Sequence, residues 1–163
     1  YFFATLLAAD GALLADLADW QVQVLRSAFS DLGLVFQLQD DVADLFADKG
    51  RGRVGSDLYE GKVTALVAAH VERVPASREE LLAVLRAPRE SKGAAEVAAA
   101  QVMFTQSGAL EWVLARLRRT VAGVRSQIAT LDEPELLELT EGLLGLALRP
   151  IQALLVSGRG GRQ

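Results

Sequence analysis

Three aspartates, Asp40, Asp41 and Asp44, form a DDxxD motif that could bind a metal ion. On a helix of about 3.6 residues per turn each step rotates by about 100°, so Asp40 and Asp44 point almost the same way, with Asp41 beside them. Carboxylates held this close repel one another unless a cation lies among them. Mg²⁺ prefers such oxygen ligands and usually takes one or two carboxylates together with substrate phosphates. The motif therefore favours a magnesium site for a phosphorylated ligand.

The segment after the motif is rich in glycine and in cations. It reads ADKGRGRVG, which contains Lys49, Arg51 and Arg53, and continues as SDLYEGK up to Lys62. In a metal–diphosphate complex the metal bridges carboxylate to phosphate, and cationic side chains take the remaining phosphate charge. An acidic helix end followed by a basic loop is the arrangement that such a complex needs.

Residues 36–62, FQLQDDVADLFADKGRGRVGSDLYEGK, resemble the second aspartate-rich region of the trans-isoprenyl diphosphate synthases, the polyprenyl synthetase family. The resemblance joins FQxxDDxxDxF, a short basic loop with glycine, and GSDLxEGK, in that order. It continues more weakly in the segments before the motif and through about Arg149 after it. It implies an all-α fold, a bundle of mostly antiparallel helices around a deep cavity, of which this chain resembles the C-terminal half.

The resemblance implies metal-binding and catalytic roles for the acidic residues. Asp40, Asp41 and Asp44 would bind the Mg²⁺ that holds the diphosphate of an allylic substrate. Asp40, Asp41 and Lys62 would be the catalytic residues. Asp57, in GSD, would orient the loop or hold a metal-bound water.

The resemblance also implies a set of groups that contact the diphosphate: Gln37, Arg53, Lys62 and Arg51. Lys62 matches the lysine of the family's EGK step directly. The chain has RGR where the family often has a TGK-like stretch, so Arg53, with Arg51 close behind, takes the place of the family's loop lysine. An arginine can bind phosphate oxygens in a bidentate manner, so the change preserves the chemistry.

The implied reaction condenses an allylic diphosphate with isopentenyl diphosphate to give a longer all-trans prenyl diphosphate. Three alternatives remain open. A non-catalytic subunit of a heteromeric synthase would share the fold, although the retained DDxxD and GSDLYEGK argue against it. A class I terpene cyclase usually carries an Asn/Ser/Glu-type second metal motif without GSDLxEGK. A helical binding module with a chance acidic face would have no metal-dependent affinity for diphosphates.

The family's first aspartate-rich motif, with the arginines near it, has no counterpart in this sequence. Half of a metal cluster cannot pre-organise a leaving diphosphate, so we expect negligible activity from this chain alone. We also expect a fragment or processed product, because the chain opens without Met on an apolar helix. Large apolar surfaces normally find a partner, which predicts a homodimer or a helix-swapped assembly.

Composition limits the remaining function classes. The 163 residues suffice for one domain, predicted over residues 1–150, with a partly disordered tail at 151–163. The absence of Cys excludes a disulfide framework and a cysteine-based zinc site, and His70 is the only histidine. A net charge of −4 gives no sign of the basic surface that binds nucleic acid.

The apolar opening lacks the positive start of a signal peptide and is too short to span a bilayer, so we expect a cytoplasmic protein without stable membrane insertion.

The sequence predicts helices with short connections and no strands. Prolines, glycines and capping residues lie near most of the boundaries. The predicted helices are Phe2–Leu14, Asp19–Asp48, Val63–Val74, Arg78–Leu85, Ser91–Thr105, Gly108–Thr130 and Pro134–Leu148.

Overall fold

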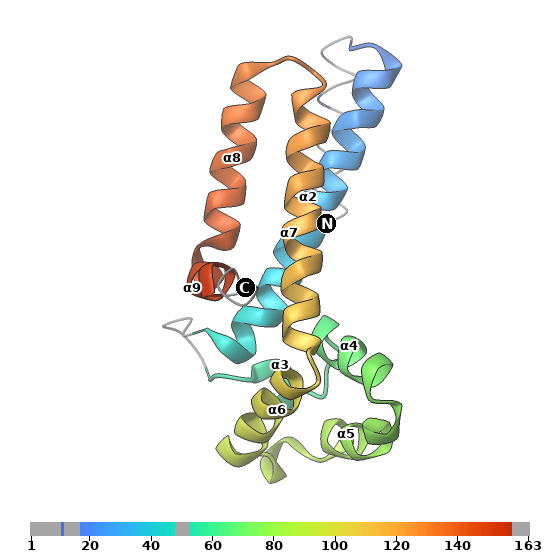
Figure 1. Cartoon of the computed structure of the whole chain (residues 1–163), viewed down its shortest axis with the longest axis vertical. Helices are drawn as coiled ribbons and strands as arrows, with labels where there is room; N and C mark the ends of the chain where they lie inside the picture. Colours follow the sequence, from blue (N-terminus) through green and yellow to red (C-terminus); the bar gives the residue numbers. More distant parts are fainter. Residues whose placement is uncertain (1–10, 12–16, 48–52, 158–163) are drawn as a thin grey trace, which may run out of the picture. The chain divides into compact units, whose positions relative to one another are not determined.

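The structure, a computed structural model, describes residue 11, residues 17–47 and residues 53–157. These residues form helices and turns with no strand among them, which confirms the predicted all-α class (Figure 1). The α-helices are α2 (Asp19–Phe46), α3 (Ser56–Tyr59), α4 (Ala65–Arg73), α5 (Arg78–Arg86), α6 (Ala94–Gln106), α7 (Ala109–Ala129), α8 (Pro134–Leu148) and α9 (Gln152–Ser157). Short 3₁₀ turns lie at η1 (Pro75–Ser77), η2 (Arg89–Ser91) and η3 (Arg149–Ile151).

The predicted helices within the described residues are present, with ends that differ by a few residues at most. Local signals set these ends. α4 follows Thr64, whose Oγ accepts a hydrogen bond from a backbone N–H of the first turn. It ends before Pro75, because a proline disfavours helical backbone at the residue that precedes it. α8 begins with Pro134, whose missing N–H is not needed in a first turn. The predicted helix Phe2–Leu14 lies outside the described residues apart from Gly11.

The chain divides into two compact units, which we describe separately. Unit 1 is made of the described residues up to 37 together with 116–149, and unit 2 of residues 38–115 together with the described residues from 150 onward.

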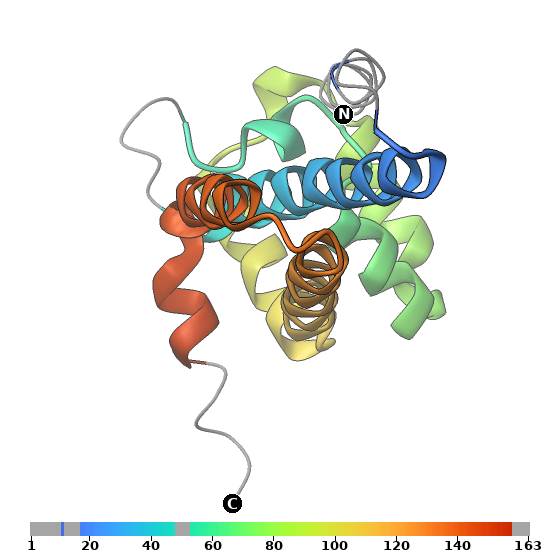
Figure 2. The same cartoon turned by 90° about the horizontal axis from the view of Figure 1, so that it is seen from above.

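Unit 1 contains the first part of α2, the later part of α7, and α8. α7 and α8 run antiparallel and are joined by a short turn (Figures 1 and 2). Gln127 on α7 donates a hydrogen bond to the Asp31 carboxylate on α2 at 2.8 Å. Arg125 on α7 makes two hydrogen bonds, of 2.6 and 2.7 Å, to the Glu141 carboxylate on α8. The buried apolar side chains of unit 1 are Val22, Leu25, Ala28, Leu32, Val35, Leu117, Val121, Val124, Ile128, Leu131, Leu144 and Ala147.

Unit 2 contains the acidic end of α2, the short helices α3 to α6, the start of α7, and α9. Phe104 on α6 is its largest fully buried side chain, at 2% exposed. The side-chain amide of Gln101 on α6 donates to the backbone carbonyl of Leu45 near the end of α2. α6 therefore supports the helix end that carries the three aspartates.

The chain continues as helix beyond residue 150, where the sequence predicted a tail. Ile151 is fully buried, and α9 follows it. The Gly-rich residues 158–163 lie outside the described part. Among the described residues one stretch, Pro134–Val156, is long and apolar enough to cross a membrane by length and composition alone. It contains the 3₁₀ turn with Arg149 and Pro150 between its two α-helices.

Candidate functional site

Asp44 binds the start of α3 with both oxygens of its carboxylate. Oδ1 accepts a hydrogen bond from Ser56 Oγ at 2.5 Å, and Oδ2 accepts one from the backbone N–H of Asp57 at 3.0 Å. The Asp44 backbone carbonyl also accepts from the N–H of Gly55 at 2.8 Å. Asp44 is only 6% exposed, and a carboxylate at a helix N-terminus satisfies donors that have no partner within the helix. This aspartate therefore fixes the GSD segment against the end of α2.

Asp41 binds the start of α4, as Asp44 binds the start of α3. Its Oδ2 accepts a hydrogen bond from the backbone N–H of Ala65, the first residue of α4, at 2.7 Å. Asp41 is 4% exposed. Hydrogen bonds to charged groups contribute about 1.5–3 kcal/mol each, so Asp41 and Asp44 both stabilise the fold. Two of the three motif carboxylates thus hold neighbouring helices of the same chain.

Asp40 and Gln37 lie on the exposed side of α2. Gln37 precedes Asp40 by about one helical turn, as the sequence spacing predicts. The structure therefore separates the three aspartates by environment: Asp40 faces solvent, whereas Asp41 and Asp44 are buried. The sequence alone assigned one metal-binding role to all three.

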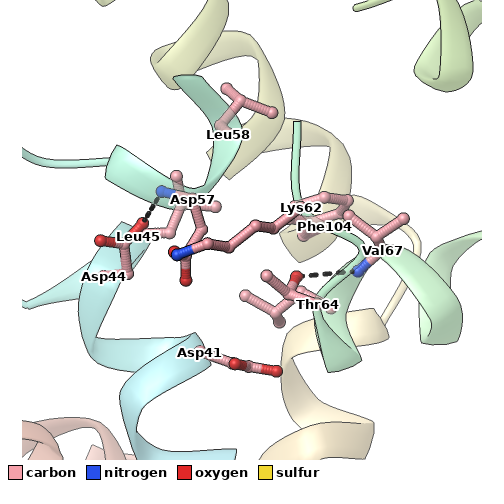
Figure 3. A pocket seen from close by; sticks show the side chains of 10 residues that line it. Asp41, Asp44, Leu45, Asp57, Leu58, Lys62, Thr64, Val67 and Phe104 are labelled. Atoms are coloured by element: carbon pink, nitrogen blue, oxygen red, sulfur yellow. Dashed lines mark hydrogen bonds and ion pairs between the residues drawn. The ribbon is translucent and has the colours of Figure 1, made fainter. Parts of the chain in front are cut away.

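Lys62 lies between two carboxylates of its own segment, of which Figure 3 shows Asp57. Its Nζ is 2.8 Å from Asp57 Oδ1 and 2.8 Å from Glu60 Oε2. Hydrogen bonds to Asp57 and then to Glu60 raise the pKa of the Lys62 ammonium above its usual value. The hydrogen bond from Lys62 lowers the pKa of Glu60. The Lys62 side chain is 57% exposed, so it remains a charged donor that a solvent-borne anion can reach.

Arg53 stacks on an aromatic ring of α3. Its guanidinium carbon lies 3.8 Å from the centroid of the Tyr59 ring, and Tyr59 is buried while Arg53 is exposed. A guanidinium over a ring face can still donate N–H groups to phosphate oxygens in a bidentate manner. Arg51 and Lys49, the other predicted loop cations, lie outside the described residues.

A cavity of about 20 Å³ lies among these residues (Figure 3). Ligand sites typically occupy about 300–1,000 Å³, so this cavity is part of the supporting structure and not a substrate pocket. Its polar lining comes from Asp41, Asp44, Asp57, Lys62 and Thr64, and its apolar lining from Leu45, Leu58, Leu66, Val67 and Phe104.

The carboxylates at the end of α2 are donors of the type that Mg²⁺ prefers. Within the described ranges, no three His, Cys, Asp or Glu side chains are grouped to hold a metal by themselves. Mg²⁺ commonly takes one or two protein carboxylates and completes its coordination with phosphate oxygens and water. Asp40, which lies on the exposed side of α2, would be the principal protein ligand from this chain, because a ligand that arrives from solvent can reach it.

Sequence reasoning missed three residues that contact the predicted site residues or begin the helices beside them: Ser56, Tyr59 and Thr64. Ser56 and Thr64 had a usable signal, because each stands directly before or at a helix start, where hydroxyl groups are common. Tyr59 had no usable signal, because no local sequence pattern shows that its ring contacts Arg53.

The described residues form a helical protein in which a short segment, residues 56–62, is bound to the acidic end of α2. Residues 1–103 match the family described as polyprenyl synthetase, and the chain belongs to that family, as the sequence predicted.

Relatives and solved structures are isoprenyl diphosphate synthases. The chain is 31% identical over 138 residues to a short chain isoprenyl diphosphate synthase of Methanothermobacter thermautotrophicus, which covers 81% of this chain and 41% of the relative. It is 44% identical over 59 residues to a protein of the same description from Methanocaldococcus jannaschii, covering 35% of this chain and 18% of the relative.

Two crystal structures show the same fold. A geranylgeranyl pyrophosphate synthase superposes with a TM-score of 0.69 at 24% identity, covering 86% of this chain and 44% of the other. A decaprenyl diphosphate synthase from Rhodobacter capsulatus gives a TM-score of 0.71 at 22% identity, covering 88% and 46%. The chain thus spans less than half the length of the proteins that it matches.

Proposed function

We propose that the protein that carries this chain is a Mg²⁺-dependent prenyltransferase, which condenses an allylic diphosphate with isopentenyl diphosphate into a longer all-trans prenyl diphosphate. The observation that carries the proposal is the pair of hydrogen bonds that the Asp44 carboxylate accepts from Ser56 Oγ and from the backbone N–H of Asp57. It fixes the GSDLYEGK segment, with Asp57 and Lys62, beside the acidic end of α2. Carboxylates and an exposed ammonium for one diphosphate are thereby held on one compact unit.

In the proposed reaction, the bond between the allylic carbon and the diphosphate oxygen breaks, and the double bond of isopentenyl diphosphate forms a new bond to that carbon. A proton then leaves, and a longer prenyl diphosphate remains. A bound magnesium ion would neutralise charge on the departing diphosphate. Asp40 would hold that ion, while Lys62 and Arg53 would bind phosphate oxygens, and Gln37 would contact the substrate from the same face of α2.

A non-catalytic subunit of a heteromeric synthase is the second candidate, and a specific observation favours it. Asp41 and Asp44 hold α4 and α3, so two motif residues stabilise the fold whether or not the chain catalyses a reaction. Such a subunit would bind a partner that supplies the other aspartate-rich motif. It would keep the fold without turnover of its own.

Binding and turnover together test the proposal. Isothermal titration of this chain with inorganic pyrophosphate should show binding with Mg²⁺ and none with EDTA. Asp40→Asn should weaken that binding about 10- to 100-fold, because the lost carboxylate is a metal ligand. Glu138→Gln, which removes an exposed carboxylate from α8 in unit 1, is the matched control and should bind like the unmodified chain.

Turnover is measured with the complete gene product. It is given isopentenyl diphosphate with dimethylallyl, geranyl or farnesyl diphosphate, and elongation should require Mg²⁺ and disappear in Asp40→Asn. Binding without elongation would favour the subunit, and metal-independent or absent binding would contradict a diphosphate site.

A further inference from the structure

Lys92 is a buried cation that the proposed reaction does not use. Its side-chain Nζ donates to three backbone carbonyls: Leu58 at 2.9 Å, Tyr59 at 3.3 Å and Leu85 at 2.8 Å. The residue is only 5% exposed. A lysine ammonium has three donors and no acceptor, so these carbonyls satisfy it completely. A buried charge held by neutral groups alone is costly, which makes its position worth explaining.

The three carbonyls come from the ends of two helices. Leu58 and Tyr59 are the last residues of α3, and Leu85 lies in the last turn of α5. Carbonyls at a helix C-terminus lack partners within the helix and carry partial negative charge, so an ammonium there is favourable. Lys92 therefore joins the end of α3 to the end of α5.

α3 is too short to be stable by itself, because the first helical turn costs more conformational entropy than its hydrogen bonds return. It is held at its start by Asp44 and at its end by Lys92. Gly61, two residues after the end of α3, fits so closely against α5 that an added Cβ would lie 2.4 Å from the Leu85 carbonyl oxygen and 3.8 Å from Lys92 Nζ. Lys62 follows directly and bonds back to Asp57 through its side chain.

We propose that Lys92 is a positioning residue of the diphosphate site, which fixes α3 and the Gly61 turn so that Asp57 and Lys62 meet the diphosphate in the correct place. The diphosphate as ligand rests on the proposed function. The role of Lys92 in fixing α3 does not depend on that function. Lys92 binds the end of α3, whereas Asp44 binds its start, and the three hydrogen bonds of Lys92 leave no donor for phosphate.

Chemical rescue at a single cysteine tests the proposal, because the chain contains no natural Cys. Lys92→Cys is alkylated in the unfolded state and refolded. An S-aminoethyl group restores an ammonium on a side chain of lysine length, whereas an S-propyl group has the same length and no charge. Ile128→Ala in α7 of unit 1 is the control for lost stability that does not touch α3.

Two measurements are made on each form at a temperature where all are folded. The first is amide hydrogen exchange at Asp57, whose N–H donates to Asp44, and at Lys62, whose N–H donates to the Asp57 carbonyl. The second is the Mg²⁺-dependent affinity for pyrophosphate. We expect the S-propyl form to lose protection at both amides and about 10- to 100-fold in affinity, and the S-aminoethyl form to recover both. Ile128→Ala should keep both.

Equal exchange and equal affinity in the S-propyl and S-aminoethyl forms would overturn the proposal. So would an affinity loss in Ile128→Ala equal to that of the S-propyl form, because general destabilisation would then explain both. If the unmodified chain does not bind pyrophosphate with Mg²⁺, the diphosphate function is contradicted. Hydrogen exchange still decides in that case whether Lys92 positions α3.

Discussion

The aspartates of the DDxxD motif differ in what their side chains touch. Asp41 and Asp44 are buried and accept hydrogen bonds from the starts of α4 and α3, whereas Asp40 is exposed. The sequence could predict that the three share a helical stripe, because that follows from helix geometry. It could not predict which of them is buried, because the donors that bind Asp41 and Asp44 belong to later segments of the chain.

Substitution of the motif should therefore separate stability from binding. Asp44→Ala should lower the free energy of unfolding by about 2–4 kcal/mol, since it removes two hydrogen bonds to a buried carboxylate. Asp40→Ala should cost less, about 1 kcal/mol or below, because Asp40 is exposed. Urea denaturation followed by circular dichroism gives both values. Equal losses in the two variants would contradict this division.

His70 is a second residue with a defined chemical state. Its Nε2 lies 2.7 Å from Ser77 Oγ, and that hydroxyl donates its own hydrogen to the Val74 carbonyl. The imidazole must then be the donor, so the proton is on Nε2. Nδ1 is buried and has no hydrogen-bond partner among the described residues, and the ring packs edge-on against Phe104. Burial lowers the pKa of His70, and the charge of Glu80 opposes the shift only in part.

This arrangement predicts a loss of stability in mild acid. Because the pKa of His70 is lower in the folded protein, the unfolded chain takes up its proton first as the pH falls. The full stability is present above about pH 6.5, the usual pKa of histidine, and is lost below it at up to about 1.4 kcal/mol per pH unit. Unfolding measured from pH 7.5 to 5 should show this slope, and His70→Gln should reduce it. An unchanged slope in the variant would mean that other groups cause it.

At the scale of elements, the turn at Gly61 is the most restrictive part of the site. Gly61 has a positive φ of 70°, and an added Cβ would lie 2.4 Å from a backbone oxygen of α5. Gly61→Ala should therefore cost about 2–3 kcal/mol through strain and displaced backbone.

Gly142 on α8 is the matched control, since nothing lies within 4 Å of the position of its Cβ. Gly142→Ala should be neutral or stabilise the protein by up to about 1 kcal/mol, because alanine is the better helix former. Thermal unfolding of the two variants provides the comparison. If Gly61→Ala leaves the thermal stability unchanged, α3 and α5 can move apart at the Lys92 link without a measurable cost.

The helices differ in how well sequence could predict them. α8 was predicted with the ends that it has, because Pro134 is a local start signal that needs no tertiary contact. α3 was missed, because four residues give no periodic pattern and the helix depends on Asp44 and Lys92 at its two ends. α9 was missed because the Gly-rich end of the chain suggested a tail, while the buried Ile151 that begins this part gives no signal in sequence.

At the scale of the whole molecule, α8 presents more apolar surface than its own unit covers. Thr140, Leu144 and Ala147 form its buried stripe, whereas Leu139 and Leu146 are 55% and 59% exposed. A helix that is apolar on most of its circumference is normally buried on most of it. We expect a second copy of the chain to cover this surface, in a homodimer or swapped assembly.

Sedimentation velocity over a range of concentrations tests that expectation. The unmodified chain should sediment as a dimer, and Leu146→Glu should shift it toward monomer by placing a charge in the interface. Val102→Glu, at an equally exposed apolar position on α6, is the control and should leave the dimer intact. A monomeric unmodified chain at all concentrations would contradict the assembly.

The caps that Asp41 and Asp44 provide bear on how such motifs persist during evolution. A lineage that stops using the reaction still needs its helices joined, so selection for folding alone would retain these two aspartates. Asp40 is exposed and is the proposed metal ligand, so selection for catalysis would act on it most directly. Among homologous chains, the first position of the motif should therefore distinguish enzymes from inactive descendants, while the other two positions should record only a shared architecture.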